Sequence, residues 1–209
     1  MIVNFKKKFS VIHIPKTGGT SIKKSLKEEN LEKDVYFFHK KKYVYPAFLE
    51  KTKIIRQKLK YSHLTLDELN NYYPELFKEI KNFELYTSIR EPWSRFKSSL
   101  IQYFGEKNIN LANINVNEMD YFLKKIISDL NSSKFNEDIS LTSFKKQSDY
   151  IFFKKEKIVK NIYTINNLDK LTEHINKKHG IYFNKIKKQN ISPKIIYNPL
   201  PQNKYSKFF

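Results

Sequence analysis

The sequence predicts an α/β fold with a central, mainly parallel sheet. Short runs rich in β-branched and aromatic residues alternate with segments that carry apolar residues at helical spacing, and no internal repeat occurs. Strands that alternate with helices are typical of parallel sheets, because two parallel neighbours need a crossover connection. The chain has 209 residues, 40% of them hydrophobic, so we expect a single domain over residues 1–209.

The first predicted unit is a strand, a glycine-containing turn and a helix. Phe9 to Ile14 reads as a short strand, and the helix that follows the turn has Ile22 and Leu26 four residues apart. Residues 35–39 (VYFFH) predict a second short strand. The basic segment 46–58 predicts a helix.

The central part of the chain predicts helices on either side of another strand. The run KLKYSH, which ends at His63, reads as a strand end. Residues 64–80 have apolar residues at helical spacing, with Pro74 as a break or a restart. Residues 83–89 (FELYTSI) predict a strand, and Pro92 opens the next helix, since proline suits the first helical turn.

The last part of the chain predicts two helices and two strands. Residues 105–117 are rich in asparagine and predict a loop, residues 118–130 a helix, and residues 131–149 a loose connection. Two strand-like runs, DYIFF and NIYTI, precede an amphipathic helix that ends at Gly180.

The composition excludes several classes of protein. Cysteine is absent, which excludes disulfides, thiolate zinc sites and a cysteine nucleophile. No run of about 18 apolar residues occurs, so we expect no transmembrane segment. The basic first residues lack the apolar stretch of a signal peptide, and a cytoplasmic location is therefore expected.

The charge is strongly positive, and it makes the rare residues informative. A net charge of +19 predicts attraction to polyanions, but a compositional bias toward lysine on a tolerant surface explains it equally well. Only three of the 40 basic residues are arginines, and only four residues are glycines. Two glycines are nevertheless adjacent, Gly18 and Gly19, and two arginines lie five residues apart, Arg90 and Arg95.

The run PKTGGTS predicts an anion-binding turn between a strand and a helix. Helix N-termini present free backbone N–H groups, and glycines let the backbone approach a phosphate. Lys16 precedes the glycines, the reverse of the Walker A order, which disfavours a kinase that uses a magnesium nucleotide. The alternative is an ordinary turn capped by a threonine. The candidate ligands of the anion are Lys16, Thr17, Gly18, Gly19, Thr20 and Ser21.

The run IPKTGGTS resembles the 5′-phosphosulfate-binding loop of sulfotransferases that use 3′-phosphoadenosine-5′-phosphosulfate (PAPS). Its KTGG form resembles the carbohydrate sulfotransferases more than the cytosolic small-molecule enzymes. The resemblance covers residues 10–103 well and residues 143–192 loosely. It implies a three-layer α/β/α fold with a P-loop-like turn, PAPS as the sulfuryl donor, 3′,5′-ADP as the product and no metal. It also implies that Lys16 stabilises the leaving phosphate.

The segment IREPWSRFKSS predicts a second phosphate-binding group. Arg90 follows a strand, where ligands of open α/β sheets bind, and a guanidinium suits bidentate phosphate recognition. The segment resembles the 3′-phosphate motif of the sulfotransferases, which implies that Arg90 and Ser98 bind the 3′-phosphate. Arg95 is expected to orient the segment, and Trp93 to lie in the core. The alternative is that Arg90 pairs with Glu91 or with a buried carboxylate.

His63, in KYSHL, is the candidate catalytic base. Its setting resembles the KTHLP segment that carries the catalytic histidine of sulfotransferases. A histidine can accept a hydroxyl proton near neutral pH. A lone polar histidine at a helix start is the alternative, and Glu68 is a reserve base, because some sulfotransferases use glutamate. His13 is expected to be structural.

The remaining candidates lie late in the chain. The cytosolic enzymes close over the nucleotide with an RKGxxGDW-type segment, which this chain lacks, so KKQNISPK is left to cover the cofactor. Gln147 is a further polar candidate near substrate or cofactor.

The favoured function is sulfuryl transfer from PAPS to a hydroxyl of an acceptor, a carbohydrate by the resemblance, with no nucleic acid as partner. Three alternatives stay open: a P-loop-like kinase that needs ATP and Mg²⁺, a basic nucleic-acid-binding protein without catalysis, and an inactive relative that still binds nucleotide.

Overall fold

The structure is a computed structural model, and it describes residues 1–26, 35–37, 63–132 and 139–186. These residues divide into two compact units. The sheet unit contains the described residues up to Ile89 together with those from Lys146 onward, and the helical unit contains those of Arg90–Lys145. The single domain expected over residues 1–209 stays a prediction. No helix within the described ranges is long and apolar enough to cross a membrane.

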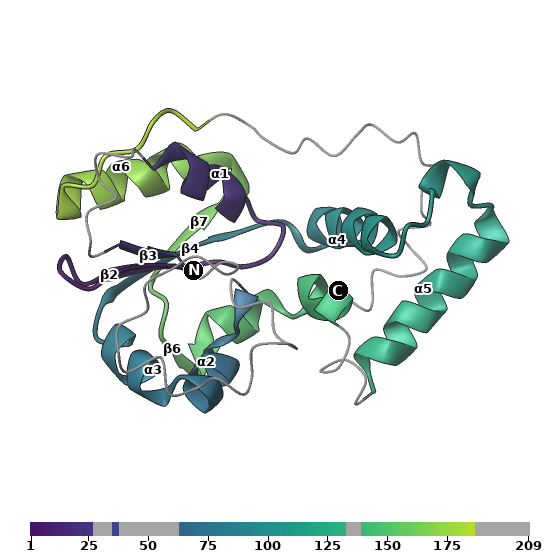
Figure 1. Ribbon diagram of the computed structural model, residues 1–209, viewed down its shortest axis with the longest axis horizontal. Helices are drawn as coiled ribbons and strands as arrows, with labels where there is room; N and C mark the ends of the chain where they lie inside the picture. Colours follow the sequence, from purple (N-terminus) through teal and green to yellow (C-terminus); the bar gives the residue numbers. More distant parts are fainter. Residues whose placement is uncertain (27–34, 38–62, 133–138, 187–209) are drawn as a thin grey trace. The chain divides into compact units, whose positions relative to one another are not determined.

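Within the described residues, five strands form one sheet in the order β3-β1-β2-β4-β7 (Figure 1). Strand β1 is antiparallel to both of its neighbours, whereas β2 pairs in parallel with β4, and β4 with β7. Four strands therefore run in one direction and β1 opposes them, which confirms an α/β fold with a mainly parallel sheet. The strands are β1 (Ile2–Asn4), β2 (Phe9–Ile12), β3 (Val35–Phe37), β4 (Glu84–Ile89) and β7 (Asn161–Thr164).

Strand β1 is an element that the sequence did not predict. It has three residues, and it pairs with β2 through Ile2 and Val11. The connection between the two strands is FKKK, with Lys8 at a φ of 50°. Lysine is not a turn signal, since tight turns usually take glycine or asparagine at such positions. The local signal is Asn4, whose Oδ1 accepts a hydrogen bond from the Lys7 amide at 2.8 Å.

Helices pack on both faces of the sheet (Figure 1). Helices α1 (Gly19–Ser25) and α6 (Leu168–His179) cover the face that carries Phe9, Val11 and Tyr86. Helices α2 (Leu66–Tyr72) and α3 (Pro74–Ile80) cover the face that carries Val3, Ile12 and Leu85. Successive side chains of β2 and β4 thus enter opposite cores, as expected for parallel strands buried on both sides.

The helix boundaries follow the local signals of the sequence. Thr65 and Glu68 form a capping box at the start of α2, and Pro74 is the first residue of α3. Gly180 ends α6 in the left-handed conformation, with a φ of 67°. The predicted break at Pro74 and the predicted end at Gly180 are confirmed.

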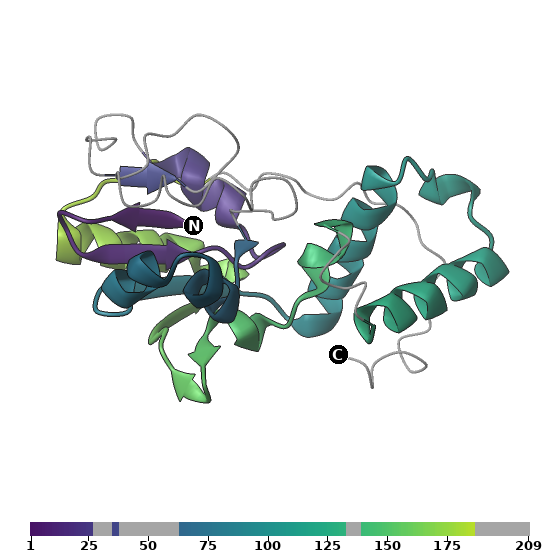
Figure 2. The same cartoon turned by 60° about the horizontal axis from the view of Figure 1, so that its bottom comes forward.

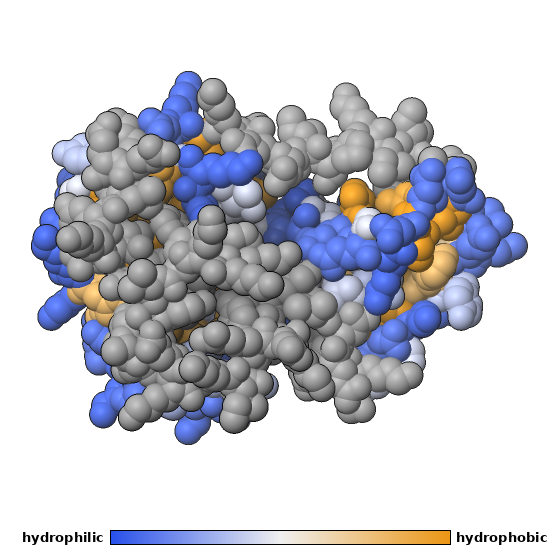
Figure 3. Space-filling model, viewed as in Figure 1, coloured by the Kyte–Doolittle hydropathy of each residue, from blue (hydrophilic) through white to orange (hydrophobic). Residues whose placement is uncertain are grey.

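The helical unit is built from α4 (Pro92–Glu106), α5 (Val116–Leu130) and the 3-10 helix η7 (Ile139–Phe144). Glu91 caps α4, and Asn115 caps α5. Apolar side chains of this unit also reach the surface (Figure 3). Val116 on α5 is an exposed hydrophobic residue. The core of the unit contains Trp93, Phe96, Leu100, Tyr103, Phe104, Leu123, Ile126 and Leu141.

Some predicted segments differ from the structure in detail. The loop expected over residues 105–117 contains the 3-10 helix η5 (Leu111–Asn113), and the connection expected over residues 131–149 contains η7 and part of η8 (Gln147–Tyr150). The run DYIFF contributes only β5 (Phe152–Phe153), which pairs with β6 (Glu156–Lys157) in a separate small hairpin (Figure 2). The helix predicted over residues 46–58 lies outside the described residues.

Candidate functional site

The PKTGGTS turn connects the carboxyl end of β2 to α1. Gly18 has a φ of 95°, and its carbonyl accepts hydrogen bonds from the amides of Ser21 and Ile22. Gly18 is therefore the N-cap of α1, in place of the threonine that the alternative required. Lys16 has a φ of 65° and is partly exposed. A positive φ is uncommon for lysine, so the surrounding contacts must hold the turn in this shape.

Thr17 ties the turn to β4. Its side chain is fully buried, and its hydroxyl donates to the carbonyl of Ile14 at 2.9 Å. The hydroxyl of Ser88, near the carboxyl end of β4, donates to the carbonyl of Thr17 at 2.8 Å. The Thr17 hydroxyl is thus used in a buried hydrogen bond that stabilises the turn. Of the three predicted hydroxyl ligands, only Thr20 is exposed, since Ser21 is buried as well.

Packing disfavours a side chain at either glycine of the turn. A Cβ atom on Gly18 would lie 2.7 Å from a methyl group of Leu168, and the φ of Gly18 already disfavours other residues. A Cβ atom on Gly19 would lie 2.0 Å from two atoms of the His13 ring. These contacts account for two glycines in a glycine-poor chain without any ligand, so the glycines by themselves do not distinguish a phosphate site from a packed turn.

His63 lies against the start of this turn. Its Nδ1 is 3.3 Å from the carbonyl oxygen of His13, and the centroids of the two imidazole rings are 4.4 Å apart. A carbonyl can only accept, so Nδ1 carries the proton in this contact and Nε2 is the basic nitrogen. The carbonyl of His63 accepts a hydrogen bond from the hydroxyl of Tyr150 at 3.1 Å. The candidate base is therefore held on both sides, at its ring and at its backbone.

The structure adds His13 to the residues around the turn and gives Glu68 another role. His13 was predicted to be structural, and its ring packs against both Gly19 and His63. Its position two residues before PKTGG was the one available signal, and the pairing with a residue 50 positions away was not visible in the sequence. The carboxylate of Glu68 accepts a hydrogen bond from the Thr65 amide at 2.9 Å, so the reserve base caps α2.

Arg90 begins the helical unit. Its Nε donates to the hydroxyl of Ser94 at 2.9 Å. Burial lowers the pKa of the Arg90 guanidinium, and the charge of Glu91 opposes this shift. The Glu91 carboxylate accepts hydrogen bonds from the amides of Trp93 and Ser94 and so caps α4. The structure thus assigns Glu91 a role in helix capping.

The other residues of this motif lie inside the helical unit. Arg95 is buried, and its guanidinium donates to the carbonyls of Ser143 and Lys145 at 2.9 and 2.8 Å, which agrees with the orienting role expected for it. Trp93 is a core aromatic, as predicted, and stacks on Phe96 with the ring centroids 5.6 Å apart. Ser98 is 5% exposed.

The structure therefore brings the Lys16–Gly19 turn, His13 and His63 together in the sheet unit, while Arg90 and Ser98 belong to the helical unit. Gln147 lies in the sheet unit and is partly exposed, and the KKQNISPK segment lies outside the described residues. No group of three or more metal-binding side chains occurs in the ranges that the structure describes.

Comparison with known proteins finds no match to this chain among family models, curated proteins or solved structures. The resemblance to sulfotransferases accordingly rests on the motifs of the chain itself.

Proposed function

We propose that this chain is a PAPS-dependent sulfotransferase that moves a sulfuryl group to a hydroxyl of an acceptor, with a carbohydrate as the favoured acceptor. One observation carries the proposal: His63 and Gly19 of the Lys16–Gly19 turn both pack against His13, the residue that follows β2. Ligands of open α/β sheets bind at the carboxyl end of the strands. For the sheet unit we propose the three-layer α/β/α class, with a P-loop-like turn at residues 15–21.

The exposed groups of the turn are suited to the 5′-phosphosulfate. Lys16 supplies a positive charge, and Thr20 supplies an exposed hydroxyl. In this proposal, the 3′-phosphate is bound by Arg90, with Ser98 as the second ligand that the resemblance implies. Contacts at both phosphates would let the enzyme distinguish PAPS from nucleotides that lack a 3′-phosphate.

The proposed reaction is an in-line displacement at sulfur. The acceptor oxygen bonds to sulfur while the bond between sulfur and the 5′-phosphate oxygen breaks, and the electron pair leaves with 3′,5′-ADP. His63 takes the proton of the acceptor hydroxyl at Nε2, because its Nδ1 is already protonated. The ammonium group of Lys16 stabilises the charge that develops on the leaving phosphate. The step balances without an oxidant or a reductant.

Nucleotide binding tests the cofactor. In calorimetry we expect the protein to bind 3′,5′-ADP more tightly than 5′-ADP. Arg90→Ala should reduce the ratio of the two affinities by a factor of about ten or more. Lys97→Ala, an exposed change on α4, which follows Arg90, is the control. Equal affinity of the unmodified protein for the two nucleotides would refute the assigned role of Arg90. Salt-dependent RNA binding in the absence of a 3′-phosphate preference would favour the nucleic-acid alternative instead.

Turnover tests the base. We expect His63→Ala to bind 3′,5′-ADP normally and to lose about 100-fold or more in kcat, the usual contribution of a general base. Lys16→Ala should weaken both nucleotide binding and turnover. Lys24→Ala, an exposed lysine later on α1, should change neither. Unimpaired turnover in His63→Ala would eliminate His63 as the base.

A further inference from the structure

We propose that the imidazole of His13 is a positioning residue for His63, and that residue 19 is a glycine to leave room for this imidazole. The catalytic consequence rests on the proposed function, but the structural coupling among the three residues does not. The proposal gives Gly19 a different task from close approach to a phosphate, which is what the sequence alone suggested.

The imidazole of His13 lies against Gly19. A Cβ atom on Gly19 would lie 2.0 Å from both Cδ2 and Nε2 of His13, and 2.7 Å from Cε1. Real side chains do not approach so closely, so any other residue at position 19 would displace the ring. The obstructing atoms belong to the end of a side chain and not to the backbone. Gly19→Ala should therefore move the His13 ring and leave the chain able to fold.

The imidazole of His13 also contacts the imidazole of His63. The two rings meet edge to face, with centroids 4.4 Å apart and an interplanar angle of 62°. Nδ1 of His63 donates to the backbone carbonyl of His13, which remains when the side chain is removed. The His13 ring is thus close to both Gly19 and His63, and we expect it to limit how far the His63 ring can rotate about the hydrogen bond of its Nδ1. A side chain at position 19 would therefore displace the His13 ring, and the displaced ring would in turn shift His63.

The position of a catalytic group matters strongly for rate, since a misplacement of about 1 Å can cost roughly 100-fold. A positioning role predicts loss in kcat with little change in KM, because His13 itself need not touch the substrate. A glycine kept for phosphate approach predicts the reverse: weaker PAPS binding after Gly19→Ala, whatever residue stands at position 13.

A double-mutant cycle tests the coupling. Gly19→Ala, His13→Ala and the double variant are compared by kcat, by KM for PAPS, by thermal unfolding and by the imidazole nitrogen NMR signals of His63. We expect Gly19→Ala to lower kcat by about tenfold or more and to shift the His63 signals away from the Nδ1–H form. In the His13→Ala background, Gly19→Ala should change none of these further. Gly105→Ala, where a Cβ atom would meet nothing within 4 Å, is the matched control.

The outcomes separate this inference from the proposed function. Independent effects of the two substitutions on the His63 signals would overturn the inference, even in an active enzyme. Coupled effects on those signals, in a protein that neither binds 3′,5′-ADP nor transfers sulfuryl groups, would support the inference and refute the proposed function. If Gly19→Ala alone unfolds, recovery of the melting temperature by His13→Ala supports the inference, and lack of recovery overturns it.

Discussion

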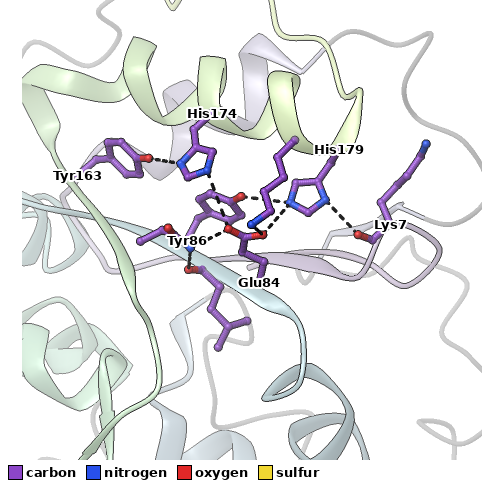
Figure 4. Close-up of polar contacts among 9 residues, drawn as sticks. Lys7, Glu84, Tyr86, Tyr163, His174 and His179 are labelled. Atoms are coloured by element: carbon purple, nitrogen blue, oxygen red, sulfur yellow. Dashed lines mark hydrogen bonds and ion pairs between the residues drawn. The ribbon is translucent and has the colours of Figure 1, made fainter.

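At the scale of single residues, the amino end of β4 carries a polar cluster, far along the strand from Ser88. Glu84 lies at its centre, and Figure 4 shows the side chains of α6 and β7 that surround it. Its carboxylate is 2.6 Å from the Lys178 ammonium and 3.5 Å from Nε2 of His179. Asn161 donates to the same carboxylate at 3.3 Å. Glu84 thus links β4 to both α6 and β7.

The protonation states in this cluster follow from burial and from partners. Burial lowers the pKa of His179 against the opposing charge of Glu84, and Nδ1 of His179 donates to the carbonyl of Lys7 at 3.1 Å. The hydroxyl oxygen of Tyr86 lies 3.1 Å from Nε2 of His179. Burial also raises the pKa of Tyr86, with Glu84 adding to the shift, so the phenol stays a donor.

The charge of Glu84 makes a pH-dependent contribution to stability. Burial works against its ionised form, but hydrogen bonds from Lys178 and Tyr86 and the charges of Lys178 and His179 outweigh burial, so the pKa of Glu84 falls below its ordinary value of 4.5. The folded state therefore binds this proton less readily than the unfolded state. The contribution is present above pH 4.5 and is lost as the pH falls through the lowered pKa.

We accordingly expect Glu84→Gln to lower the free energy of unfolding at pH 7 by about 1 kcal/mol, the usual value of a partly exposed charged hydrogen bond. The difference from the unmodified protein should shrink as the pH falls below 4.5. Urea unfolding at neutral and acid pH measures it. Glu173→Gln, an exposed change on α6, should have little effect. An equal difference in the free energy of unfolding between the two proteins at pH 7 and at acid pH would contradict the role given to the Glu84 charge.

At the scale of secondary-structure elements, lysine occupies turn positions that usually belong to glycine or asparagine. The β5–β6 hairpin turns through Lys154 and Lys155, with φ values of 48° and 69°. Two successive residues at positive φ form the kind of two-residue turn that Asn-Gly favours. Each lysine there is less favourable than glycine, because its Cβ crowds the backbone in the left-handed region.

Replacing this pair with the favoured residues should stabilise the hairpin. We expect Lys154→Asn with Lys155→Gly to raise the free energy of unfolding by about 1 kcal/mol, after the loss of the weak contact between Lys154 and the Phe153 ring. Thermal unfolding measures the change. Lys81→Gly is the control, since Lys81 has a φ of −62° and glycine gains nothing there. A lower melting temperature for the double variant would show that the turn does not need the left-handed conformation.

At the scale of the whole molecule, the division into two compact units bears on whether they unfold in one cooperative transition. The sheet unit and the helical unit each have a separate apolar core. Arg95 holds the helical unit together from within, because it links α4 to the carbonyls of Ser143 and Lys145. Removing a buried guanidinium leaves acceptors without a donor, which costs more than the hydrogen bonds themselves contribute.

We expect Arg95→Met to weaken the helical unit by about 2–3 kcal/mol and to leave the sheet unit protected. Hydrogen exchange measured by mass spectrometry should show faster exchange over residues 92–144 and unchanged exchange in β2, β4 and β7. Lys97→Met, an exposed change on the same helix, is the control. Equal loss of protection in the sheet would instead show one cooperative domain, as the sequence predicted.

Local signals were sufficient for most helices and strands. Pro74 marks the restart between α2 and α3, Gly180 marks the end of α6, and the alternation of strands with helices gave the α/β class. Strand β1 was missed, because it has three residues and a turn of lysines. Its place in the sheet depends on pairing with β2 and β3, and Asn4, which accepts a hydrogen bond from the Lys7 amide, is its one turn-forming residue.

The sequence by itself was enough to predict an anion site at the turn after β2 and a base at His63. Such predictions depend only on which residue types occur and in what order. Only the tertiary structure decided that the Thr17 hydroxyl is bonded inside the fold and that the His13 ring packs against both Gly19 and His63. These contacts join residues far apart in the chain, or depend on how closely two side chains pack. Neither is encoded in the periodicity of a single segment, because packing is settled by all neighbouring elements together.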